Sequence, residues 1–218
     1  MNTPIPYLDG FILASTIYPS GFSHSLYSAW KGLPRRLTTG FLAFLAFPYL
    51  VFCPVVWVLR PSLLTWRSTS GLWVLAAVLM PIIVMTVEYV IHGVAFYWTT
   101  GKIPAWFSVH QMGRKQLTVQ DCALFAVVVI GEEIVYRGIG ISVLRESFAF
   151  PWAISIVISS LAYGLNHLAF GGLSFVSKAA AGVFYGTLYV LGGQSILLPI
   201  LAHGLQNTAL FALARDNA

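Results

Sequence analysis

Long apolar runs, each near the length that spans a bilayer, are the feature that most limits how this chain can fold. An α-helix needs roughly 20 apolar residues to cross the hydrocarbon. Six stretches meet this need, at about 40–59, 71–98, 119–145, 151–170, 173–192 and 195–214. Only 9% of the 218 residues are charged, whereas soluble domains have about a quarter. The sequence therefore predicts an all-α, polytopic membrane bundle of about six transmembrane helices.

Residues 1–36 differ from the spans that follow. Their apolar run from Gly10 to Tyr18 is too short to cross a bilayer, and Pro19 and Gly21 interrupt it. Its aromatic side chains suit the headgroup level. We expect an interfacial amino-terminal arm here, with re-entry into the membrane as the alternative, and a transmembrane domain over 37–218.

Lysine and arginine in the loops set the expected orientation, because they concentrate on the cytoplasmic side. A cytoplasmic amino terminus gathers most of them on that side: Lys31, Arg35, Arg36, Lys102, Arg114, Lys115, Lys178 and Arg215. Both termini are therefore expected in the cytoplasm, and the compact, loop-poor chain favours a bacterial plasma membrane. The net charge of +5 fits this topology and anionic lipid, and no basic run predicts nucleic-acid binding.

Charged residues inside the third span carry the first functional signal, because ionisable groups in a membrane are costly and usually face a cavity or a bundle interior. Glu133 and Arg137 are four positions apart, so they share a helix face and can pair. Glu132 lies about 100° around the helix. One arginine cannot neutralise both carboxylates, so the spacing predicts one paired and one free carboxylate. A purely structural ion cluster is the alternative.

Two more spans carry polar side chains at helical spacing. Tyr163 and His167 lie on one face of the fourth span, and His203 and Asn207 lie on one face of the sixth. A carboxylate, two imidazoles and an amide can activate a water and stabilise an oxyanion. Straight helices would nevertheless place Glu132 at mid-span, His167 nearer the cytoplasmic end and His203 nearer the outer half.

The residues E132-E-I-V-Y-R137, Y163-G-L-N-H167 and H203-G-L-Q-N207 resemble the three motifs of the CPBP family. This family contains type II CAAX prenyl endopeptidases and bacteriocin-processing and immunity proteins. The resemblance covers about 119–214, a four-helix core, and departs from the usual pattern at Tyr163, where phenylalanine is usual.

The resemblance implies an intramembrane glutamic endopeptidase that acts on a membrane-associated protein or peptide. Glu132 would be the general base, and His167 would help to bind and polarise the water. His203 and Asn207 would form the oxyanion site. Glu133, Arg137 and Tyr163 would be supporting residues, and no metal or other cofactor is implied. The substrate would carry a prenylated tail, a leader or a sorting segment.

Three other functions fit parts of the pattern. Glu132, His167 and His203 are ligand types that suit zinc, although no H-E-x-x-H pair is present. A non-catalytic immunity or assembly protein could use the polar cluster for packing alone. A proton-coupled transporter could use the carboxylates and His167 as a relay, but no internal repeat is visible.

Overall fold

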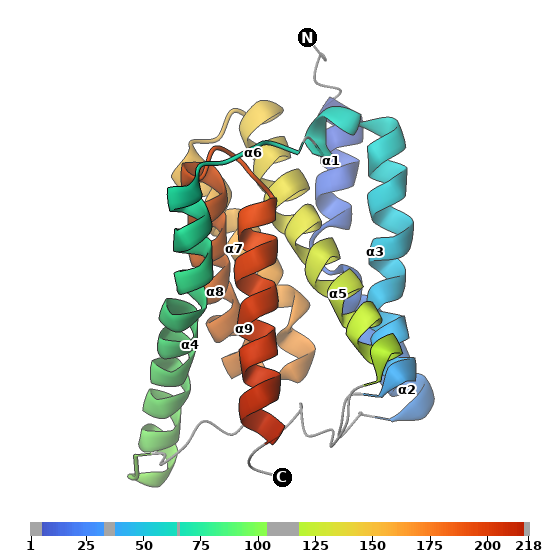
Figure 1. Ribbon diagram of the computed structural model, residues 1–218. Helices are drawn as coiled ribbons and strands as arrows, with labels where there is room; N and C mark the ends of the chain where they lie inside the picture. Colours follow the sequence, from blue (N-terminus) through green and yellow to red (C-terminus); the bar gives the residue numbers. More distant parts are fainter. Residues whose placement is uncertain (1–5, 33–37, 65, 104–117, 216–218) are drawn as a thin grey trace.

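The computed structural model describes residues 6–32, 38–64, 66–103 and 118–215. All regular secondary structure in these ranges is helical (Figure 1). The main helices are α1 (Pro6–Ser15), α2 (Pro19–Lys31), α3 (Thr39–Leu59), α4 (Gly71–Thr100), α5 (Val119–Glu133), α7 (Trp152–Asn166), α8 (Gly172–Leu191) and α9 (Leu197–Arg215). Four short segments connect them: η1 (Pro61–Leu64), η2 (Ile134–Ile141), α6 (Ser142–Glu146) and η3 (Leu168–Phe170).

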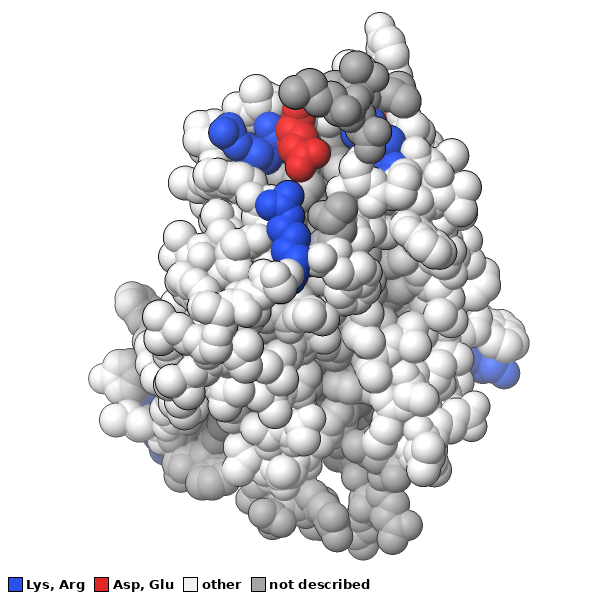
Figure 2. All heavy atoms as spheres, turned by 45° about the horizontal axis from the view of Figure 1, so that its top comes forward, with Lys and Arg blue, Asp and Glu red and all other residues white. Residues whose placement is uncertain are grey.

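The six predicted spans coincide with helical segments to within a few residues. The helices α3, α4 and α8 are long and apolar enough to cross a membrane, and α7 and α9 are shorter apolar helices. The third predicted span is α5 continued through η2 and α6. Figure 2 shows that charged side chains gather near the upper end of the molecule, while the flanks on that face are almost free of charge. The predicted helical membrane bundle is therefore confirmed.

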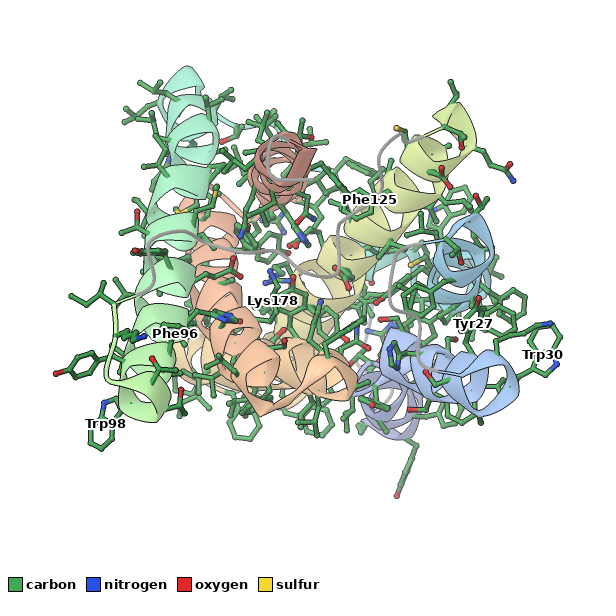
Figure 3. All side chains as sticks on the ribbon, turned by 90° about the horizontal axis from the view of Figure 1, so that it is seen from below. Tyr27, Trp30, Phe96, Trp98, Phe125 and Lys178 are labelled. Carbon is green, nitrogen blue, oxygen red and sulfur yellow. The ribbon has the colours of Figure 1, made fainter. Side chains whose placement is uncertain are left out.

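The amino-terminal segment forms two helices with different roles. Helix α1 runs along the bundle axis, and α2 lies across the lower end, where Figure 3 shows it side-on with Trp30 pointing outward. In α1, Asp9 is fully buried, and its carboxylate pairs with Arg60 at 2.7 Å. The interfacial position of residues 1–36 stays a prediction.

The two ends of the described chain lie at opposite ends of the bundle. The first described residues lie at the upper end, and α9 ends at the lower end (Figure 1). Helix α1 has only 10 residues, which is too short for the criterion of about 20 apolar residues that marks a span. The cytoplasmic location of both termini stays a prediction.

The start of α5 is fixed by its own sequence and by α3. Thr118 caps the helix by accepting a hydrogen bond from the backbone N–H of Asp121, and the Asp121 carboxylate accepts one from the N–H of Thr118 in return. The other Asp121 oxygen accepts a hydrogen bond from the Thr39 hydroxyl at 2.6 Å. These contacts anchor the lower end of α5, and the helix then slants across the bundle (Figure 1).

Two apolar clusters flank the middle of the bundle. One joins α4, α8 and α9 and contains Val84, Tyr185 and Leu198. The other joins α3, α5 and α7 and contains Tyr49. Gly131 allows the second cluster to close, because a Cβ atom there would lie only 2.4 Å from the Tyr49 ring. A neighbouring helix therefore approaches closely at Gly131, and the polar site lies between the two clusters.

Candidate active site

The predicted site residues come from three helices that meet in the bundle. Glu132 lies in the last turn of α5, where the helix passes into the π-helical segment η2. His167 is the residue that ends α7. His203 and Asn207 lie one turn apart on α9. A π-helical turn inside a longer helix is frequent at functional sites.

These four side chains line one cavity of about 160 Å³. The lining reaches from Glu132 in the interior to Phe125 and Phe170 near the lower end. Figure 3, which looks at the bundle from below, shows Phe125 on α5 and Lys178 on α8, both of which line the cavity. A larger cavity of about 820 Å³ lies between α1, α2 and α3, but apolar side chains form almost all of its lining and it contains none of the predicted site residues.

The Glu132 carboxylate lies between the two histidines. One of its oxygens is 3.8 Å from Nε2 of His167, and the other is 3.9 Å from Nε2 of His203. Both separations are too long for a direct hydrogen bond but suit a bridging water. Glu132 is 4% exposed, so its carboxylate is buried at the wall of the cavity.

The Glu133 carboxylate faces a closed part of the bundle instead. Its Oε2 lies 3.2 Å from Nε of Arg137, in the i, i+4 pairing that the sequence predicts. Its Oε1 lies 2.7 Å from Nδ1 of His203. Arg137 also donates a hydrogen bond to the carbonyl of Gly182 in α8 at 3.4 Å. One carboxylate is therefore paired with arginine, while the other faces the cavity.

Hydrogen bonds fix the orientation of both imidazoles. Nδ1 of His203 must donate to Glu133, because a carboxylate only accepts. Nδ1 of His167 donates to the backbone carbonyl of Tyr163 at 3.0 Å. In both rings Nε2 is therefore the atom turned toward Glu132 and able to act on a bound molecule.

Tyr163 supports the site with its ring and its hydroxyl. The guanidinium of Arg137 lies over the ring at 4.5 Å, a favourable cation–π contact. The ring also packs edge-on against His167 with centroids 4.9 Å apart. The hydroxyl lies 3.5 Å from Nε2 of His203, so this hydrogen bond is a weak one.

A polar group next to His167, the amide of Asn166, was not predicted as part of the site. Asn166 accepts a hydrogen bond from the backbone N–H of Gly21 at 2.8 Å and donates to the hydroxyls of Ser20 and Tyr49. These bonds join α2 and α3 to the end of α7. Asn166 and Ser20 both line the cavity. A buried amide within an apolar span was the available signal.

The structure resolves the predicted mismatch in depth. Helix α7 has 15 residues, about 22 Å of helix, and ends four residues earlier than the predicted span. The chain then descends after α8 before α9 begins (Figure 1). Because α5 is also tilted, Glu132, His167 and His203 reach one level.

The described residues include no group of three or more His, Cys, Asp or Glu side chains arranged to hold a metal ion. The residues that the zinc alternative would use are the same ones that line the cavity, and Glu133 already occupies Nδ1 of His203.

The fold and site together define a polytopic helical membrane protein with a buried carboxylate and two histidines in one cavity. Residues 115–209 match the family described as "Type II CAAX prenyl endopeptidase Rce1-like". The resemblance to the CPBP family is confirmed over this stretch, which contains all three motifs, and it supports a CAAX-type intramembrane protease. Comparison with curated proteins and with solved structures gave no match.

Proposed function

We propose that this protein is an intramembrane endopeptidase in which Glu132 activates a water for attack on a peptide bond. The observation that carries the proposal is the position of the Glu132 carboxylate, within 4 Å of Nε2 of both His167 and His203 at the wall of a cavity. Among the described residues Glu132 has no arginine at ion-pair distance, and such a carboxylate can accept a proton.

The water would bind between Glu132 and His167. Both the carboxylate and Nε2 of a neutral His167 accept hydrogen bonds, so each would take one hydrogen of the water. The oxygen lone pair is then left to attack the carbonyl carbon of the substrate. As the C–O bond forms, a proton passes to Glu132.

The tetrahedral intermediate would be stabilised from α9. The amide of Asn207 can donate to the oxyanion, and Nε2 of His203 can donate when the ring carries both protons. Glu133 accepts a hydrogen bond from Nδ1 of His203 at 2.7 Å, which holds the ring with Nε2 turned toward the cavity. Glu132 would return the proton to the leaving amine, which completes hydrolysis of the C–N bond.

The cavity reaches the lower end of the bundle, and we propose that this end faces the cytoplasm. Lys31 at the end of α2 and Lys102 after α4 lie at this end. The sequence segments that begin with these two lysines carry more basic residues than the segments around Arg60, Arg67 and Arg145, as the positive-inside rule requires of the cytoplasmic side. The substrate would be a membrane-associated protein that presents a tail, leader or sorting segment there. A bacterial plasma membrane is the proposed location.

The direct test is co-expression of the protein with candidate substrates, followed by mass spectrometry of their ends. Wild type is expected to release a defined fragment, and Glu132→Gln is expected to release none while reaching the same folded yield. Full processing by Glu132→Gln would contradict this mechanism. Loss of activity on chelation, with recovery on adding zinc, would favour the metal alternative.

Binding without cleavage is the remaining outcome of the same test. If the protein is a non-catalytic immunity or assembly protein, the wild type and Glu132→Gln should bind the partner equally well. Neither form should change the mass of the partner.

A further inference from the structure

Glu88 is a buried carboxylate in a helix that the three motifs do not include. It is the only Asp, Glu, Lys or Arg between residues 71 and 100, and it is 3% exposed. A carboxylate in such an apolar helix is costly unless it is paired and hydrogen-bonded. Its contacts therefore indicate what it does.

Both oxygens of Glu88 are used, and by different helices. Oε1 lies 2.7 Å from Nζ of Lys178 on α8. Oε2 accepts a hydrogen bond from Nε2 of Gln206 on α9 at 2.8 Å. Lys178 lines the cavity together with Glu132. Glu88 thus holds a cation at the cavity with one oxygen and an amide of α9 with the other.

The amide of Gln206 connects Glu88 to a residue that contacts His203. Because Nε2 donates to Glu88, the carbonyl oxygen of the same amide is turned toward Tyr185, whose hydroxyl donates to it. The Tyr185 ring stacks on His203, with centroids 5.3 Å apart and an interplanar angle of 21°. All three side chains are almost completely buried.

His203 is therefore held from two directions. Glu133 binds Nδ1 at one edge of the ring, and Tyr185 supports one face. The edge contact alone would leave the ring free to swing about the hydrogen bond. The stacked face limits that rotation, and the Glu88 contact to Gln206 fixes the hydroxyl end of Tyr185.

We propose that Glu88 is a positioning residue that orients His203 through Gln206 and Tyr185. The inference rests on the proposed peptidase function for its effect on rate, but not for its effect on the histidine ring. Glu88 touches no reacting atom in this arrangement. Its role is to keep Nε2 of His203 aimed at the oxyanion, where small misplacements are costly.

The kinetic test compares Glu88→Gln with Thr86→Ala. Thr86 lies on the same helix, is exposed, and bonds only to its own helix at Ile82 among the contacts described. Glu88→Gln is expected to lower kcat by up to about 10²-fold with little change in KM. Thr86→Ala is expected to behave as wild type. Equal kcat values for the two variants would overturn the proposal.

A second pair of variants separates positioning from simple charge neutralisation. If Glu88 only balances Lys178, then Glu88→Leu combined with Lys178→Met, which removes both charges and leaves no acceptor for Gln206, should recover the wild-type kcat. The proposal expects this double variant to remain slow. It also expects Tyr185→Phe and Glu88→Gln to be non-additive, because both break the same chain of contacts. Recovery in the first case, or full additivity in the second, would contradict it.

A measurement without substrate keeps the test independent of the peptidase proposal. The ring resonances of His203, assigned with His203→Ala, report the stacked Tyr185 ring through its ring current. We expect Glu88→Gln to shift these resonances and Thr86→Ala to leave them in place. If wild type cleaves nothing, the proposed function fails while this spectrum still decides the role of Glu88. Unshifted resonances in Glu88→Gln would overturn it.

Discussion

The cavity wall at Glu132 and the closed cluster around Glu133 begin one residue apart on α5. Successive residues on a helix point about 100° apart, so one carboxylate faces the cavity and the other faces Arg137 and His203. Both side chains are buried, at 4% and 0% exposed. Burial alone therefore does not distinguish a carboxylate that faces a cavity from one held in a closed ion pair.

The difference lies in the partners. Glu133 has an arginine at ion-pair distance and an imidazole N–H at hydrogen-bond distance. Glu132 has two imidazole nitrogens just beyond hydrogen-bond distance. A paired carboxylate stabilises the fold, whereas one with room for a water beside it can take a proton. A substitution at Glu132 should therefore affect catalysis, whereas the same substitution at Glu133 should affect stability.

The largest expected effect is that of Glu132→Gln on catalysis. The amide is nearly isosteric but cannot accept the proton, so cleavage should fall by about 10²–10⁴-fold, the usual contribution of a general base. Thermal unfolding in detergent should be unchanged. A rate within tenfold of wild type would show that another group is the base.

Glu133→Gln should instead act on stability. It leaves the Arg137 charge buried without its partner, which costs about 3–5 kcal/mol. The double variant Glu133→Gln with Arg137→Met should lose less, because the pair is removed as a unit and the introduced amide oxygen can still accept from His203. Unfolding monitored by circular dichroism gives both values. Equal losses for the single and double variants would contradict the structural pairing.

Asn207→Ala should lower kcat by about 10²–10³-fold, the usual cost of one oxyanion donor. Thr208→Ala is the matched control, because Thr208 is exposed on the same helix and its hydroxyl bonds to the carbonyl of Gly204. Steady-state kinetics on the identified substrate measures both. Similar kcat values for the two variants would remove Asn207 from the oxyanion site.

Tyr163→Phe should have the smallest effect. The ring keeps its contacts with Arg137 and His167, and only the 3.5 Å contact to His203 is lost. A net hydrogen bond contributes about 1 kcal/mol, so kcat/KM should change by no more than about fivefold. A larger loss would show that the hydroxyl takes part in the reaction.

The sequence was a good guide to the helices and to the paired carboxylate. The length of an apolar run marks a membrane span without any knowledge of the helices that pack against it, so segments such as 71–98 could be predicted directly. The pairing of Glu133 with Arg137 follows from spacing on one helix. These predictions depend only on local sequence.

Contacts between distant segments could not be predicted in this way. Nothing in the spacing of Glu88 and Lys178 indicates that they meet, since 90 residues separate them. The pairing of Asp9 in α1 with Arg60 was missed for the same reason, since 51 positions separate the two residues. Such pairs are set by packing, which a single sequence does not show.

The contact between Glu88 and Lys178 also limits how short this protein can be made. The matched family segment starts at residue 115, so a fragment cut there would keep Lys178 and Gln206 but lose the carboxylate that binds both. Gly131 would likewise lose Tyr49, which covers it. The smallest unit that can be transplanted or redesigned is therefore longer than the stretch that carries the motifs, and it must include α3 and α4.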